Sequence, residues 1–363
     1  MNRRVALLAS VAILGLVLLV PRVSRAQSSP PEANWQFAVS GDSRNCGDVV
    51  MPAIAAQVLG KRAAFFWHLG DFRKIYDFDE DMQHQPEHRA APMTIGDYED
   101  QAWDDFLKNQ IAPFGALPVF LGIGNHEAVP PKYRSDYLAQ FADWLDAPVL
   151  RAQRLADDPN DHLLKTYYHW TERGVDFIFL DNATLDQFDE KQIGWFERVL
   201  DRDAGNPAIR AIVVGMHRAL PENLSGGHGM SESPTGAASG RQVYKDLLKA
   251  QNDAHKHVYV LASHSHYYMA GIFDTDYWRA NGGVLPGWII GTAGAQRYLL
   301  PRGASRATAA ENNVYGYLLA TVQPDGEIRF DFQRLAERDV PAAINSRYTP
   351  EFIHWCFGEN AAK

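Results

Sequence analysis

The sequence predicts an α/β fold in which β-sheets are buried between helices. Short apolar segments rich in β-branched and aromatic residues alternate with segments of helical periodicity through the first two thirds of the chain. That alternation is typical of α/β domains with buried sheets. The 363 residues, 46% hydrophobic and 22% charged, suffice for one large α/β domain or two smaller ones and exclude a disordered or fibrous chain.

The predicted elements follow in chain order. The expected strands before residue 266 are Gln36–Ser40, Phe65–Leu69, Val119–Ile123, Val175–Leu180, Ile209–Gly215 and His257–Ala262. The expected helices are Val49–Leu59, Tyr98–Ile111, Tyr133–Trp144, Glu190–Leu200 and Gln242–Ala250. Later strands are Trp288–Ile290, Val314–Val322 and Glu327–Phe332, and the turn at Pro324-Asp325-Gly326 predicts that the last two form a hairpin. The segment Arg218–Gly240, rich in Gly, Ser and Pro, is expected to be a long loop.

The N-terminus has the order of a secretory signal peptide. Arg3-Arg4 precede an apolar run over residues 5–20, and Ser24-Arg25-Ala26 offers small residues before a cleavage point. We therefore expect a signal peptide over 1–26 and a secreted or periplasmic protein; the alternative is a membrane anchor formed by residues 5–20. A linker over 27–33, a folded domain over 34–335 and a C-terminal tail over 336–363 packed on that domain complete the expected organisation.

The net charge of the chain disfavours some classes of partner, and its cysteine content excludes some classes of metal site. Removing the four arginines of residues 1–26, a segment without acidic residues, leaves 31 Lys plus Arg against 44 Asp plus Glu, a formal net charge of −13. Such a surface disfavours nucleic acids and, once the leader is cleaved, membrane surfaces as partners. Two cysteines, Cys46 and Cys356, exclude a four-cysteine zinc or iron–sulfur site. In an oxidising compartment they either pair or remain two separate thiols.

Polar residues follow five of the predicted strands. Because the carboxyl ends of parallel strands gather at one edge of a sheet, we expect these residues to converge. Each alone has an ordinary alternative: a Gly-Asp pair often forms a turn or caps a helix, and a single histidine such as His217 often only donates a structural hydrogen bond. Together they offer imidazole and carboxylate groups, which suit zinc, manganese, iron or nickel, with enough donors for two ions. The groups are Gly41-Asp42, Gly70-Asp71, Gly124-Asn125-His126-Glu127, Met216-His217 and His264-Ser265-His266.

This ordered set resembles the calcineurin-like metallophosphoesterases, and within them the purple-acid-phosphatase-like branch. The resemblance implies two packed mixed β-sheets flanked by helices, a four-layer metallophosphoesterase sandwich over residues 34–335. It also implies two divalent or mixed-valence transition metal ions and a metal-bridging hydroxide as nucleophile. Asp71 would bridge the ions, Asn125, His217 and His264 would complete one site, and Asp42 and His266 would belong to the other. His126 would protonate the leaving oxygen or stabilise the phosphorane, Glu127 would orient His126, and Asn125 would also contact substrate.

The chain departs from the family pattern at the first site. Arg44 stands where the commonest motif, Asp-x-His, has histidine, and Lys74 stands where the purple enzymes have tyrosine. Tyr76, Asn45 or water is left to complete that site. Arg44 either contacts the substrate phosphate or is a surface or ion-paired arginine, and His228 either contacts substrate or is an exposed loop histidine.

The sequence thus predicts an exported metal-dependent phosphoesterase that hydrolyses small phosphomonoesters or diesters. The alternative is a phosphate- or metal-binding protein on the same scaffold with impaired catalysis, which the arginine at position 44 suggests. A nuclease is disfavoured by the acidic charge of the chain. The sequence leaves the oligomeric state open.

Overall fold

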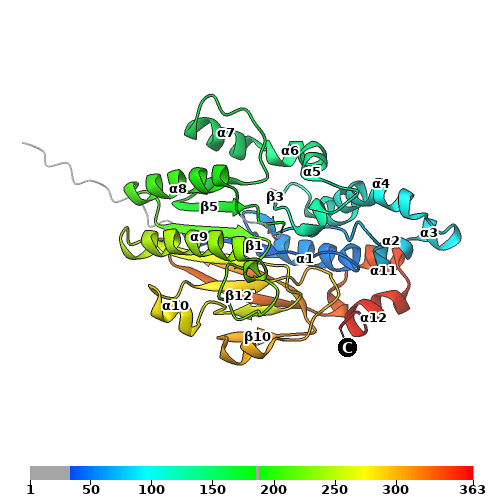
Figure 1. The fold of residues 1–363 in the computed structure, drawn as a ribbon. Coiled ribbons are helices and arrows are strands. Elements are labelled where there is room, and N and C mark those ends of the chain that lie inside the picture. The colour runs from blue at the N-terminus through cyan, green and yellow to red at the C-terminus, as the bar shows by residue number, and fades with distance from the viewer. Residues whose placement is uncertain (1–32, 185–187, 363) are drawn as a thin grey trace, which may run out of the picture. The chain divides into compact units, whose positions relative to one another are not determined.

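Two mixed β-sheets packed against each other form the centre of the fold (Figure 1). The computed structural model describes residues 33–184 and 188–362, so the predicted leader, 1–26, and nearly all of the linker lie outside the described residues. The five-stranded sheet has the order β12-β11-β1-β2-β3 and the seven-stranded sheet the order β10-β8-β9-β7-β6-β5-β4. The strands are β1 Trp35–Ser40, β2 Phe66–His68, β3 Val119–Leu121, β4 Tyr168–Glu172, β5 Val175–Leu180, β6 Ala211–Met216, β7 His257–Ala262, β8 Tyr268–Ala270, β9 Gly287–Ile290, β10 Ala309–Glu311, β11 Tyr315–Val322 and β12 Ile328–Leu335.

The five-stranded sheet is parallel at one end and antiparallel at the other, and the seven-stranded sheet has a parallel centre between antiparallel edge pairs. In the first sheet β1, β2 and β3 run parallel, and the predicted hairpin of β11 and β12 is confirmed beside β1. In the second, β5, β6, β7 and β9 run parallel, with β4, β8 and β10 antiparallel at the edges. The parallel strands direct their carboxyl ends to one side, which is where the predicted ligands follow them.

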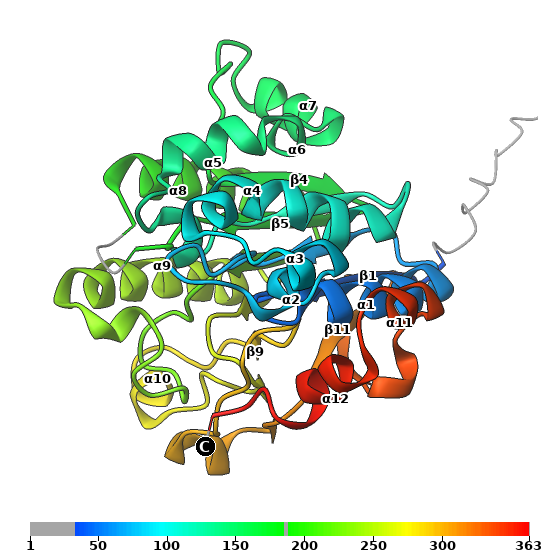
Figure 2. The same ribbon diagram turned by 90° about the vertical axis from the view of Figure 1, so that its right-hand side faces the viewer.

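Helices lie outside the sheets (Figure 2). Short 3-10 or π segments extend or join them, among them η1 Leu107–Ile111, η3 Asn125–Ala128 and η4 Met230–Glu232. The helices are α1 Gly47–Lys61, α2 Glu80–Gln83, α3 Pro86–Ala90, α4 Ile95–Phe106, α5 Arg134–Gln140, α6 Ala142–Leu145, α7 Pro148–Asp157, α8 Glu190–Gly205, α9 Pro234–Asn252, α10 Asp276–Ala280, α11 Ala342–Arg347 and α12 Pro350–Gly358.

The order of layers follows from the buried side chains. Aromatic rings from both sheets meet between them: the centroids of Phe37 on β1 and Phe177 on β5 are 5.0 Å apart. The outer face of the seven-stranded sheet packs against α8 and α9 in a second apolar core that includes Phe196 and Tyr244. On the other side, the Tyr317 hydroxyl of β11 bonds Gln57 of α1. The predicted class, two mixed sheets flanked by helices, is confirmed.

The C-terminal segment after residue 335 lies against the start of the domain. Cys46, which precedes α1, forms a disulfide with Cys356 of α12, with 5.9 Å between the Cα atoms. The Tyr348 hydroxyl donates a 2.7 Å hydrogen bond to the carboxylate of Asp48 in α1. These contacts attach the last helix to the segment that follows β1.

Several elements differ from the sequence prediction. Strands β4, β8 and β10 were not predicted, and β4 pairs antiparallel with β5 at the sheet edge. The expected loop Arg218–Gly240 is wrong over its last residues, because α9 begins at Pro234 with the Ser233 side chain accepting the Gly236 N–H. Gly240 is needed inside this helix, since a Cβ there would lie 2.4 Å from Pro221 Cδ.

In residues 33–184 and 188–362, no helix combines the length and apolar character that crossing a membrane requires.

Candidate metal centre

The predicted ligands come together at the carboxyl ends of the parallel strands. Asp42 follows β1, Asp71 follows β2, Asn125 follows β3, His217 follows β6, and His264 and His266 follow β7. His217 Nε2 lies 3.0 Å from Asn125 Oδ1, 3.1 Å from His264 Nδ1 and 3.3 Å from Asp71 Oδ1. His266 Nε2 lies 3.2 Å from Asp42 Oδ1. Residues from five strands, far apart in sequence, therefore share one small buried volume.

The backbone at these strand ends explains the Gly-Asp pattern. Asp42, Asp71 and His264 have φ values of 59°, 61° and 65°, a left-handed conformation that is uncommon for residues other than glycine. Gly70 has no room for a side chain, because a Cβ would lie 2.4 Å from the backbone nitrogen of Gly124. The two loops that carry Asp71 and Asn125 can approach each other only because both have glycine at this contact.

Four residues form what we call the four-ligand site: Asp71, Asn125, His217 and His264. His217 Nδ1–H donates to the Leu69 carbonyl oxygen at 3.0 Å, which directs Nε2 at the other three. Ligand atoms of Asp71, His217 and His264 all lie within 4.8 Å of one another. This mix of carboxylate, amide and imidazole groups suits a transition metal ion.

Burial controls the charge of these groups. Burial lowers the pKa of His264 well below its ordinary value, so its ring is neutral and its lone pair is available. Burial disfavours the charged form of Asp71, but the adjoining imidazoles and Arg44 hold the pKa of this carboxyl well below its usual range. Burial opposes a charge on His217, but Asp71 raises the pKa of this ring, so a metal ion at the four-ligand site competes with a proton on His217.

The second group, which we call the arginine site, consists of Arg44 with Asp42, Asp71 and His266. Arg44 is buried, with 7% of its surface exposed. Its Nη2 lies 2.8 Å from His266 Nε2, its Nη1 contacts His126 Nε2, and its Nε lies 3.7 Å from Asp71 Oδ2. The guanidinium points inward among the predicted ligands, so the alternative of an exposed surface arginine is wrong, whereas the alternative of an ion-paired arginine agrees with its contact with Asp71.

The two residues expected to complete the first metal site lie elsewhere. Tyr76 is exposed and its ring stacks on His126, with centroids 5.1 Å apart. The Asn45 amide donates to Glu80 at 2.5 Å and its oxygen accepts the Gln296 N–H at 3.1 Å. Neither side chain faces Asp42 and His266, so the prediction that one of them completes this site is not supported.

Glu127 makes different contacts from those expected. His126 Nδ1–H donates to the Lys74 carbonyl oxygen at 2.6 Å, and burial together with Arg44 lowers its pKa to about 4, so its ring is neutral near pH 7. Glu127 does not orient this ring through its carboxylate. Its oxygens instead accept three backbone N–H groups, those of Asp71, Phe72 and Gly124, at 2.8, 2.8 and 2.7 Å. Glu127 therefore holds the two metal-site loops together.

Other residues lie at the centre whose positions the sequence analysis did not predict or left open. The Tyr298 ring stacks on His266 with centroids 4.0 Å apart, and the Gln296 carbonyl accepts from His266 Nδ1 at 2.6 Å; no sequence signal marks either residue. Arg218 directly follows His217, is buried, and pairs with Glu232 at 2.9 Å. His228 is exposed at the rim, its ring centroid 5.7 Å from that of His264.

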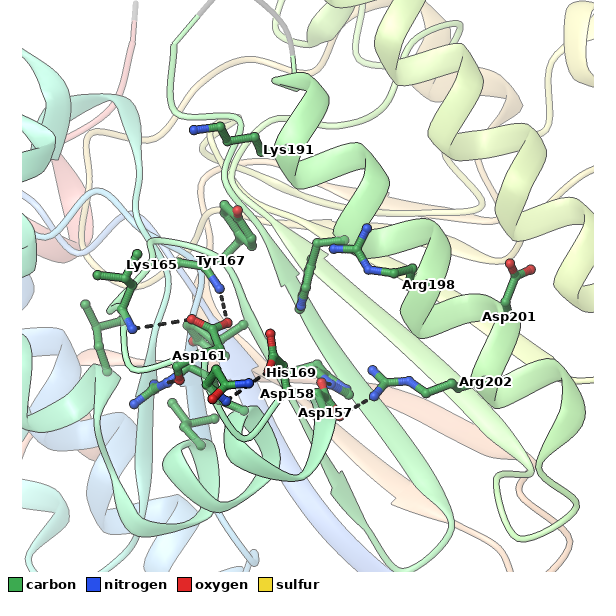
Figure 3. A pocket seen from close by; sticks show the side chains of 17 residues that line it. Asp157, Asp158, Asp161, Lys165, Tyr167, His169, Lys191, Arg198, Asp201 and Arg202 are labelled. Carbon is green, nitrogen blue, oxygen red and sulfur yellow. Dashed lines mark hydrogen bonds and ion pairs between the residues drawn. The ribbon is translucent and has the colours of Figure 1, made fainter.

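A larger hollow, of about 650 Å³, lies between α7, β4 and α8 and shares no residue with this centre (Figure 3). Several of its charged side chains pair with one another: Lys165 with Asp161, and Arg202 with Asp157 at 2.5 Å. His169 lies between Asp157 and Asp176, at 2.5 and 2.8 Å. Figure 3 draws no such pair for Lys191, Arg198 and Asp201, so part of the charge that lines this hollow is not compensated within it.

Comparisons with known proteins agree with the geometry. The yellow lupin (Lupinus luteus) purple acid phosphatase PPD1 shares the fold at a TM-score of 0.53 and 16% identity, over 84% of this chain and 52% of that one. A structure of PhoD shares it at a TM-score of 0.52 and 16% identity, over 84% of this chain and 70% of that one. The chain thus spans about half the length of the lupin enzyme. Comparison with curated protein sequences gives no match.

The family assignment rests on the sequence itself. Residues 51–268 match the model of the calcineurin-like phosphoesterases, a range that holds Asp71, Asn125, His217, His264 and His266 but begins after Asp42 and Arg44. This range is more than half of the 363 residues. The chain therefore belongs to the calcineurin-like phosphoesterase family.

Proposed function

We propose that this protein is an exported phosphoester hydrolase that acts on small phosphomonoesters or diesters with a metal ion held at the four-ligand site. The observation that carries the proposal is the convergence of carboxylate, amide and imidazole groups from four strand ends, with His217 Nε2 at 3.0–3.3 Å from its three neighbours. A divalent cation there supplies Lewis-acid polarisation of a phosphoryl oxygen and an acidified water near neutral pH.

The residues of the chain hold and shield this site. Glu127 fixes the backbone under Asp71 and Asn125, and Asp42 Oδ2 accepts the His264 N–H at 2.7 Å, which sets the direction of that ligand. Arg44 adds a positive charge beside the site, and a guanidinium attracts phosphate oxygens in pairs. His126 Nε2 contacts Arg44 beside the site, and in this proposal His126 protonates the leaving oxygen or stabilises the phosphorane.

Export and substrate size are supported by separate features. The Cys46–Cys356 disulfide is buried and belongs to an oxidising compartment. The acidic balance of the chain favours small substrates over polyanions.

N-terminal sequencing of the mature protein tests export: a start at Gln27 supports the leader prediction, whereas a membrane-bound chain that retains residue 5 overturns it. The expected count of two metal ions stays a prediction.

Metal analysis and model esters test the activity. We expect nitrophenyl phosphate or bis-nitrophenyl phosphate to be hydrolysed, chelation to abolish turnover, and zinc or manganese to restore it. His217→Ala and Asn125→Ala should lower bound metal and reduce the rate about 100-fold or more. His126→Ala should reduce the rate about 100-fold with metal retained. His257, the exposed first residue of β7, provides the control: His257→Ala should change neither.

The contacts of Arg44 favour one second candidate, a protein that binds metal or phosphate without turnover. The guanidinium already contacts His126 and His266, two groups that the enzyme would need. Metal-loaded protein that binds inorganic phosphate but hydrolyses neither ester would support this candidate and contradict the enzyme.

A further inference from the structure

We propose that the Arg44 guanidinium takes the place of one of the two metal ions that the family resemblance implies, so that this chain binds a single ion, at the four-ligand site. This inference rests on the proposed metal-dependent function and concerns the same centre. It would make the chain a one-ion member of a two-ion family, with an arginine as its fixed second cation.

The first argument concerns the one free lone pair of His266. A neutral imidazole has one N–H and one lone pair. His266 uses its N–H on Nδ1, which donates to the Gln296 carbonyl oxygen at 2.6 Å. The remaining lone pair, on Nε2, lies 2.8 Å from Arg44 Nη2 and accepts its hydrogen bond. A metal ion on His266 would need that same lone pair, so Arg44 and an ion exclude each other at this nitrogen.

The second argument concerns charge. Asp42 and Asp71 are fully buried, and Arg44 is the buried cation that faces them. A guanidinium stays charged at every accessible pH. A divalent ion inserted beside this guanidinium would meet a like charge in a buried site, where water screens poorly. The four-ligand site has no arginine or lysine among its members, and Arg218, the buried arginine that follows His217, is paired with Glu232 at 2.9 Å.

The third argument concerns the missing ligands. The side chains that the sequence offered to complete the first metal site are Tyr76 and Asn45, and both contact other groups. Asp42 Oδ1 and Asp71 Oδ2 accept no hydrogen bond from any described residue, and Arg44 Nε, equally unbonded, lies 3.7 Å from Asp71 Oδ2. A small shift of the guanidinium closes that bond. A second ion would use the same two oxygens, so the number of ions bound decides between the arrangements.

Metal counting tests the inference without reference to activity. Full-length protein is loaded with Mn²⁺ or Zn²⁺, dialysed, and analysed by elemental mass spectrometry and titration calorimetry. We expect one ion per chain, and the Mn²⁺ form should give an uncoupled paramagnetic resonance spectrum. Two equivalents with a coupled spectrum, as two ions about 3.5–4 Å apart produce, would overturn the inference and leave the proposed function standing. No bound ion would overturn both.

Matched variants locate the ion. Asp42→Asn keeps the shape of the side chain and suits the left-handed backbone there, and it should leave one ion bound. Asn125→Ala should remove it. The reverse pattern, an ion lost with Asp42→Asn and kept with Asn125→Ala, would place the ion at the arginine site and refute the inference.

Removing the arginine should open the second position. Arg44→His, which restores the family's Asp-x-His motif, and Arg44→Ala should each raise the count from one ion to two. Arg306→Ala, which removes an arginine paired with Asp276 elsewhere on the surface, should keep the count at one. A count that stays at one in both folded Arg44 variants would show that Arg44 does not exclude the second ion and would overturn the inference.

Discussion

Replacing Glu127 with alanine is expected to destabilise the protein more than an ordinary loss of one side-chain hydrogen bond. The carboxylate is buried and accepts the N–H groups of Asp71, Phe72 and Gly124. Two of these donors belong to the loop after β2 and one to the loop after β3. Glu127→Ala therefore leaves three backbone donors without a partner and separates the loops that present the metal ligands.

The size of the effect follows from the three bonds. A buried donor left without a partner costs about 1–3 kcal/mol, so three give about 3–9 kcal/mol. Water entering the space of the deleted side chain recovers part of this loss, and we expect the free energy of unfolding to fall by about 3–5 kcal/mol. Glu127→Gln keeps one oxygen acceptor and should lose about 1–3 kcal/mol.

Chemical denaturation of metal-free protein measures these losses, so that metal binding does not contribute. Asp189 is the matched control: its side chain caps α8 by accepting one N–H, that of Gln192, at 2.9 Å. Asp189→Ala should cost about 1 kcal/mol. The reasoning is refuted if Glu127→Ala destabilises no more than Asp189→Ala does.

Two further predictions concern features outside the centre. The bond between Cys46 and Cys356 closes a loop across a separation of 310 residues, so replacing both cysteines with serine should lower stability by about 2–5 kcal/mol; a melting temperature that reductant leaves unchanged in the native protein would contradict this. Burial opposes a charge on His169, but Asp176 and Asp157 raise its pKa to about 9. Its stabilising contribution is then complete below about pH 6.5 and lost as the pH rises through 9. Denaturation curves from pH 6 to 10 should show that decline, and His169→Gln should flatten it.

The sequence was most informative where chemistry and topology coincide. Polar residues directly after buried strands had to meet at one sheet edge, so the convergence of Asp71, Asn125, His217 and His264 followed from strand order alone. Strand β4 was missed because the sequence Tyr-His-Trp-Thr-Glu neither alternates clearly nor forms an apolar run, and its pairing with β5 supplies the order that pattern does not.

The direction of individual side chains could not be predicted in the same way. The arginine at position 44 indicated a departure from the family pattern, but no neighbouring residue in the sequence indicates whether its side chain points outward or toward His266. The family resemblance assigned Glu127 to orient His126, yet these neighbouring residues point differently in the 3-10 turn that holds them. Glu127 bonds backbone groups of a loop more than 50 residues away in the sequence. A pattern of neighbouring residues cannot predict a contact between two loops so far apart.

Strand β1 pairs on one side with β2 and on the other with β11, whose Val322 lies opposite Trp35. During synthesis the first strand to leave the ribosome therefore waits for nearly the whole chain before its second neighbour exists. Contacts so distant in sequence slow folding and leave an unpaired edge exposed in the meantime. A growing chain of this protein should thus depend on chaperones that keep early segments from associating, and fragments ended before residue 315 should be insoluble rather than partly native.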